Sequence, residues 1–148
     1  MKKFIIVEII PNMLDYKKGC IVQLQALKIK EGRIIDRMDY RLDYNLIDNP
    51  DIIRMINYDN EMFNYTKSKK MIINKFMEFI EDYDIFIIDN VYTRNYLKDV
   101  KNNMISIFDY LNICNDDQAF NVLINKYQLQ PSNHLVDLLF EAITFHDA

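Results

Sequence analysis

Three carboxylates stand where they could take part in chemistry: Glu8, Asp89 and Asp137. Glu8 interrupts the apolar run of residues 4–10, which otherwise holds only phenylalanine, isoleucine and valine. A carboxylate inside such a run must find a cationic partner, a metal ion or solvent at the sheet edge. Because side chains alternate along a strand, we expect Glu8 to share a face with Ile6. Glu8 is therefore either a solvated or paired acid at a strand end, or part of a site.

Asp89 and Asn90 end a second apolar run, which begins at Asp84. In open α/β sheets such strand ends often border ligand crevices, which makes both residues candidates for a binding site. The alternative is that Asp89 or Asn90 caps the helix that follows.

Asp137 lies in a predicted helix together with His134 and Glu141, at spacings that place the three on one helix face. That face is either a solvated polar surface or part of a site. His134 alone is more typical of a surface or packing residue than of a ligand.

A lysine-rich segment contains Lys67, Lys69, Lys70 and Lys75. These side chains either contact phosphates or form the solvated side of an amphipathic helix. Lys69 and Lys70, with Asn90, are the candidate nucleic-acid contacts. The net charge of −4 argues against binding nucleic acid through bulk positive charge, although it allows a local basic groove.

The composition excludes several other site types. With only Gly19 and Gly32 in 148 residues, the chain contains neither a glycine-rich dinucleotide fingerprint nor a P-loop. Its two cysteines and two histidines lack the paired spacing of a structural zinc site, and fit a reducing, cytoplasmic setting. The short apolar run near the start contains Glu8 and lacks a small-residue cleavage site, so we do not expect a signal peptide. We also expect no membrane association, since no apolar run is long enough to span a bilayer.

The elements that position these residues follow from hydrophobic periodicity. Glu31 and Gly32 separate two alternating runs and predict a β-hairpin. Strands are predicted at residues 3–10, 20–30, 33–43, 84–89 and 104–107. Helices are predicted from Pro50 onward, at 67–81, 90–102 and 116–128, and around Leu135, Leu138, Leu139 and Ala142. This order predicts one domain over residues 1–148, an α/β fold with a mixed five-stranded sheet flanked by helices and beginning with an antiparallel three-strand unit.

The order of elements and two local motifs resemble the DnaQ-like 3′–5′ exonucleases, the proofreading type that includes the exonuclease part of PolC polymerases. Residues 28–37, KIKEGRIIDR, look like the family's second hairpin, V-K-D-G-x-I-I-D. Residues 56–62, INYDNEM, look like its T-G-I-T-D-E-M segment. The resemblance runs from Phe4 to about Ile143 and implies a ribonuclease H-like fold.

The catalytic pattern of that family uses four carboxylates that hold two Mg²⁺ or Mn²⁺ ions, and a histidine as general base. Carried over by position, Glu8 stands at the first aspartate and Ile10 at the glutamate of Asp-x-Glu. Thr93 stands at the aspartate of the family's His-Asn-x-x-Phe-Asp motif. In the last motif, His-x-x-x-x-Asp, Ser132 stands at the histidine and Asp137 keeps the aspartate. The resemblance therefore implies that Glu8 and Asp137 are remnants of a catalytic site.

These departures predict a catalytically impaired module that binds nucleic acid or a protein partner, with no cofactor. The alternative is an active or weakly active 3′–5′ exonuclease for single-stranded nucleic acid, in which Glu8, Asp89 and Asp137 hold Mg²⁺ or Mn²⁺. A third interpretation is a small-molecule binding protein that shares only the fold.

Overall fold

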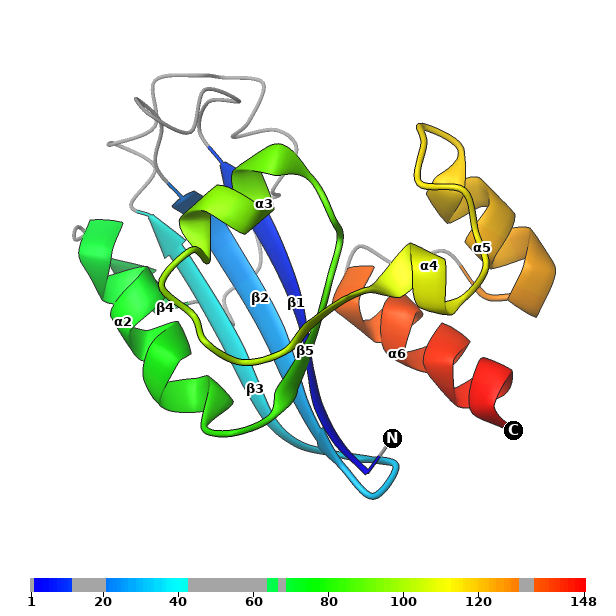
Figure 1. The fold of residues 1–148 in the computed structure, drawn as a ribbon, viewed down its shortest axis with the longest axis horizontal. Coiled ribbons are helices and arrows are strands. Elements are labelled where there is room, and N and C mark those ends of the chain that lie inside the picture. The colour runs from blue at the N-terminus through cyan, green and yellow to red at the C-terminus, as the bar shows by residue number, and fades with distance from the viewer. Residues whose placement is uncertain (1, 12–20, 43–63, 67–68, 131–134) are drawn as a thin grey trace.

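One mixed sheet organises the chain in the computed structural model, which describes residues 2–11, 21–42, 64–66, 69–130 and 135–148 (Figure 1). Its strands are β1 (Lys3–Pro11), β2 (Ile21–Lys30), β3 (Arg33–Leu42), β4 (Asn64–Thr66), β5 (Asp84–Ile87) and β6 (Met104–Ser106). They lie in the order β4-β3-β2-β1-β5-β6. The first three strands are antiparallel neighbours, whereas β5 runs parallel to β1, β6 parallel to β5 and β4 parallel to β3. The predicted ribonuclease H-like fold class is confirmed, and the short β4 adds an edge strand that the periodicity did not indicate.

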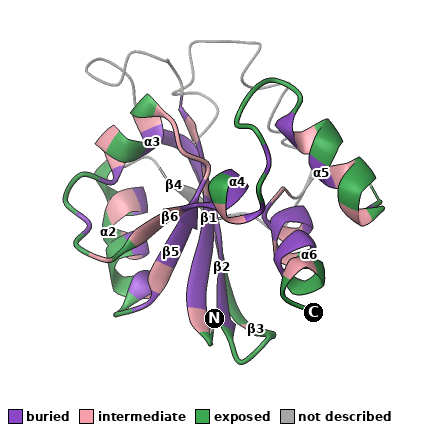
Figure 2. Ribbon diagram, turned by 45° about the vertical axis from the view of Figure 1, so that its right-hand side comes forward, coloured by how far each residue is buried: buried purple, intermediate pink, exposed green. Residues whose placement is uncertain are grey.

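Different helices cover the two faces of this sheet (Figures 1 and 2). They are α2 (Lys69–Ile80), α3 (Val91–Tyr96), α4 (Ile107–Tyr110), α5 (Ala119–Tyr127) and α6 (Leu135–Asp147). One core cluster joins α2 and the end of the α3 segment to the first face. A second cluster joins α4, α5 and α6 to the opposite face.

Strand alternation divides β1 between these two clusters. Ile5 and Val7 belong to the α2 side, whereas Phe4 and Ile6 belong to the α6 side. Glu8 therefore extends from the α6 side of the sheet, on the same face as Ile6, as predicted.

The hairpin between β2 and β3 turns at the predicted residues. Glu31 has φ 52° and Gly32 has φ 77°, so both central residues have positive φ. Such turns match the right-handed twist of paired strands and favour glycine. The register of β2 against β3 shifts between Lys28 and Ile29, shortly before this turn.

Three predicted element boundaries near β5 and β6 are wrong, and the strand predicted over 84–89 ends at Ile87. The helix expected over 90–102 ends at Tyr96, because the chain then turns to bury Leu97 and Val100 against the α2-side cluster. Ile107 begins α4 instead of ending a strand, and it is buried in the α6-side cluster. Val91, the first residue of α3, is 70% exposed.

Of the four apolar positions predicted for the last helix, Leu135 is half-buried and the other three are buried, and α2 also has a buried apolar stripe. Ile72, Phe76 and Ile80 of α2 are buried, as are Leu138, Leu139 and Ala142 of α6. The helix predicted from Pro50 lies outside the described residues. None of the helices in the described part of the chain is long and apolar enough to cross a membrane.

Candidate functional site at the carboxyl end of the central strands

A row of polar side chains crosses the sheet near the end of β1. Glu8 of β1 pairs in register with Gln25 of β2, which pairs in register with Asp39 of β3. Residues directly opposite one another in adjacent strands place their side chains on the same face. The amide Nε2 of Gln25 donates a hydrogen bond to Oδ2 of Asp39 at 3.0 Å. The row thus places two carboxyl groups on one face, with a carboxamide between them.

The carboxyl group of Glu8 is enclosed. Its Oε2 atom is shielded from solvent and has no hydrogen-bond partner among the described residues. The expectation that Glu8 reaches water or a basic group is therefore not met by this oxygen. Burial raises the pKa of Glu8 to about 7, with a further contribution from the negative charge of Asp39. Glu8 accordingly exchanges its proton near neutral pH.

A buried cation lies in the next row of the same face. Arg41 is 3% exposed, and its Nε lies 3.8 Å from Oδ1 of Asp39. With the Gln23 amide oriented to satisfy its neighbours, its oxygen accepts from Nε and Nη2 of Arg41 at 3.2 and 3.1 Å. Sequence reasoning missed Gln23, Asp39 and Arg41, although their alternation along the predicted hairpin places them on one face.

The segment after β5 forms the start of α3. Asn90 is the N-cap, and its Oδ1 accepts a hydrogen bond from the backbone N–H of Thr93 at 2.9 Å. The capping alternative for Asn90 is therefore confirmed. Thr93, which the resemblance aligns with an aspartate, is buried. Burial also raises the pKa of Tyr92, which is near enough to feel the charge of Glu8.

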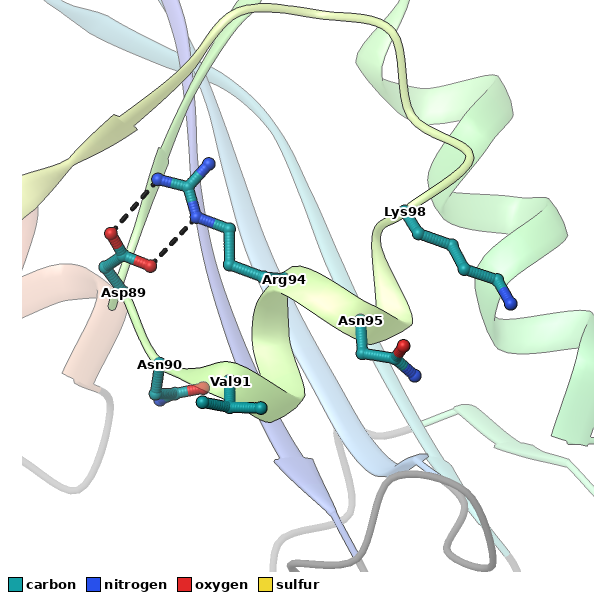
Figure 3. Close-up of a pocket in the computed structure, with 6 residues that line it drawn as sticks. All are labelled: Asp89, Asn90, Val91, Arg94, Asn95 and Lys98. Atoms are coloured by element: carbon teal, nitrogen blue, oxygen red, sulfur yellow. Dashed lines mark hydrogen bonds and ion pairs between the residues drawn. The ribbon is translucent and has the colours of Figure 1, made fainter.

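Asp89 forms an ion pair with Arg94 of α3 (Figure 3). Oδ1 accepts from Nε at 2.9 Å and Oδ2 accepts from Nη2 at 3.0 Å. These hydrogen bonds lower the pKa of Asp89 and keep its carboxylate charged. The pair borders an open pocket of about 510 Å³, lined by Asp89, Asn90, Val91, Arg94, Asn95 and Lys98.

Asp137, in the first turn of α6, forms a second pair of the same kind. Nη2 and Nη1 of Arg37 in β3 donate to Oδ1 and Oδ2 of Asp137 at 2.8 and 3.3 Å. Arg37 lies opposite Leu27 in register, one row away from Gln25 and Glu8. This contact attaches the start of α6 to the hairpin strand.

In the described part of the chain, two of the three predicted metal ligands already have a cationic partner. Asp89 and Asp137 each hold an arginine, and Ile10 has no oxygen to offer at its position. Among the residues that the structure describes, no three histidine, cysteine or acidic side chains are grouped to hold a metal ion. A divalent ion at either aspartate would have to displace a guanidinium group.

The remaining candidates stay predictions. Ser132, His134 and Lys67 lie outside the described residues, and of Lys69 only the backbone is described. Lys70 is exposed at the start of α2, as a contact with phosphate requires. Glu141 is exposed on α6, which fits the solvated face proposed for it.

Comparison with known proteins gives one partial match. A DNA polymerase III of the PolC type from Pediococcus pentosaceus is 25% identical in an alignment of 112 residues, and the match covers 70% of this chain. The matched part is 8% of the polymerase, so the chain spans a small piece of that protein's length. No family model matches the chain. The similarity is thus to a short part of a polymerase, and the sheet topology is that of a ribonuclease H-like fold.

Proposed function

We propose that this chain is an exonuclease-like module that binds a nucleic acid or protein partner and does not hydrolyse phosphodiesters efficiently. The observation that carries the proposal is the pairing of Asp89 with Arg94 and of Asp137 with Arg37. In each pair a guanidinium group already supplies the positive charge that a metal ion would otherwise bring to the carboxylate.

Two-metal hydrolysis needs several charged oxygen ligands around ions held a few ångströms apart. Because burial raises the pKa of Glu8 to about 7, a metal ion would have to compete with a proton for this carboxyl group near neutral pH. Ile10 contributes no ligand atom, and the hydroxyl of Ser132 is a weak base near pH 7. These residues together support a binding role over catalysis.

A second candidate is the weakly active Mg²⁺- or Mn²⁺-dependent 3′–5′ exonuclease, acting on single strands. The buried Oε2 of Glu8, without a hydrogen-bond partner among the described residues, favours it. A buried oxygen that lacks a donor is a ligand atom that a cation could satisfy. In this alternative, Asp89 and Asp137 would have to exchange their arginines for the metal ion.

The test is digestion of end-labelled single-stranded DNA and RNA with Mn²⁺ in excess. We compare the unmodified protein with the variants Glu8→Ala and Asp137→Ala. The matched control is Glu141→Ala, at an exposed position of α6. We expect intact strands in every reaction. Cleavage by the unmodified protein and the control, lost in both Glu8→Ala and Asp137→Ala, would overturn the proposal in favour of the exonuclease.

A further inference from the structure

The last turn of α6 lies beyond the part of the helix that the core holds (Figure 2). Ile143 is buried, whereas Thr144, Phe145 and Asp147 are exposed and His146 is half-buried. Helices in folded proteins owe most of their stability to the packing of an apolar face. Burial of apolar side chains therefore stabilises α6 as far as Ile143, and other contacts hold the turn that follows.

The local sequence of this turn does not favour a helix. Residues 143–147, ITFHD, all belong to types with a lower helix propensity than alanine, leucine or lysine. Asp147 also places a carboxylate at the negative end of the helix macrodipole, where an acid is unfavourable. Oγ1 of Thr144 donates a hydrogen bond to the carbonyl oxygen of Phe140 at 2.9 Å, an arrangement that slightly destabilises helices. The turn therefore depends on side chains from other elements.

Two tyrosines from two other helices contact this turn. Tyr110 is the last residue of α4, and its hydroxyl donates a hydrogen bond to Oδ1 of Asp147 at 2.6 Å. Tyr127 is the last residue of α5, and its hydroxyl forms a hydrogen bond with Nδ1 of His146 at 3.0 Å. The partners are 37 and 19 residues apart in the sequence, so both contacts are tertiary. They join the last turn of α6 to α4 and to α5.

The ring of Tyr110 also connects the turn to the core. Its centroid lies 5.0 Å from that of Phe86 in β5 and 5.3 Å from that of His146. The hydrogen bond to Asp147, together with burial, raises the pKa of Tyr110 to about 12. The hydroxyl therefore keeps its proton across the physiological pH range and remains a donor to Asp147.

We infer that Tyr110 and Tyr127 form a latch that holds the last turn of α6 closed, and that this turn opens and closes independently of the core. When the latch opens, α6 ends near Ile143 and the Tyr110 ring loses its contact with His146. The buried residues of α6 keep their positions, because all of them precede the turn. Such local opening, at a lower free energy than global unfolding, is typical of segments with few buried apolar contacts. The latch is independent of the proposed binding role.

Native-state hydrogen exchange, followed by NMR at several low concentrations of urea, tests the inference in the unmodified protein. We expect the amides of residues 144–147 to exchange through an opening that hardly depends on urea, since it exposes little surface. The amide of Phe86 should show the strong urea dependence of global unfolding. The inference is overturned if residues 144–147 share that dependence, because the turn then unfolds only with the core. It is equally overturned if they exchange as fast as an unstructured peptide, because nothing then holds the turn closed.

Variants of the two tyrosines test the latch itself. Tyr110→Phe removes the hydroxyl and keeps the ring, so we expect the amides of residues 144–147 to exchange about fivefold faster. Tyr127→Phe should act in the same direction. The matched control is Tyr40→Phe in β3, which packs against the α2-side cluster on the other face of the sheet. It should leave exchange in the turn within about twofold of the unmodified protein, even if it lowers overall stability. Equal exchange in Tyr110→Phe and Tyr40→Phe would show that there is no latch.

Discussion

Two halves of one sheet face differ sharply in chemistry. The apolar half consists of Phe4, Ile6, Leu27, Ile29 and Phe86, all buried under α4, α5 and α6. The polar half consists of Glu8, Gln25, Asp39, Gln23 and Arg41, on the same face toward the end of β1. Side-chain alternation therefore determines which face a residue occupies, but not whether that part of the face is a core or a site.

We expect the largest effect on stability from a substitution that creates a cavity in the apolar half. Phe86 is fully buried and makes edge-to-face contacts with Phe4 and Tyr110, with ring centroids 5.3 and 5.0 Å apart. We expect Phe86→Ala to lower the free energy of unfolding by about 3–5 kcal/mol, because it leaves a cavity. Urea denaturation followed by circular dichroism measures this change.

Phe145→Ala is the matched control for that substitution. Phe145 lies in α6 and is 58% exposed, so we expect its removal to change the free energy of unfolding by less than about 0.5 kcal/mol. Similar losses in the two variants would show that the apolar half is not the stabilising core.

An intermediate effect is expected in the polar half, and it depends on pH. An ordinary glutamate titrates near 4.5, whereas Glu8 in the folded chain titrates near 7. Between these values the folded protein binds more protons than the unfolded chain, so stability falls as pH rises and levels off above pH 7. At pH 8, Glu8→Gln should be more stable than the unmodified protein by about 2–3 kcal/mol.

Thermal denaturation from pH 5 to pH 8 tests this prediction. Glu141→Gln, at an exposed position of α6, should keep the pH dependence of the unmodified protein. If Glu8→Gln keeps it too, another group is responsible, and the polar half does not hold a proton at Glu8.

The smallest effect is expected where the two halves meet. Arg37 lies opposite Leu27 of the apolar half and holds Asp137, and both charged groups are partly exposed. We expect Arg37→Gln to cost only about 0.5–1 kcal/mol, because solvent screens the pair. Arg33→Gln on the same strand should cost less in the same urea titration. An equal cost would show that the pair with Asp137 contributes nothing.

The fold was largely predictable because β1 and β5 are apolar runs, and β2 and β3 alternate apolar and polar residues on either side of a turn glycine. The positive φ values at Glu31 and Gly32 follow from the turn that their position demands. The C-terminal end of α3 was not predictable. Leu97 and Val100 have the spacing of a longer helix, but they are buried in the turn that follows α3. Burial depends on tertiary neighbours, which local periodicity does not contain.

The candidate site was predictable only where its partners are close in sequence. Arg94 follows Asp89 by five residues, so their pairing could be predicted from their spacing in the sequence. Arg37 and Asp137 are separated by 100 residues, and no spacing rule connects them. The row of Glu8, Gln25 and Asp39 follows from three strands meeting in register, which requires the sheet order as well as the sequence.

The central position of β1 has a consequence for synthesis on the ribosome. Its antiparallel neighbour β2 follows soon along the chain, but its parallel neighbour β5 begins only at Asp84. Until β5 emerges, the nascent three-strand unit exposes the backbone of Phe4, Ile5, Ile6 and Val7 along one edge. An unpaired apolar edge is a template for association between chains. We therefore expect the nascent polypeptide to be prone to aggregation between completion of β3 and arrival of β5, an interval that translation speed controls.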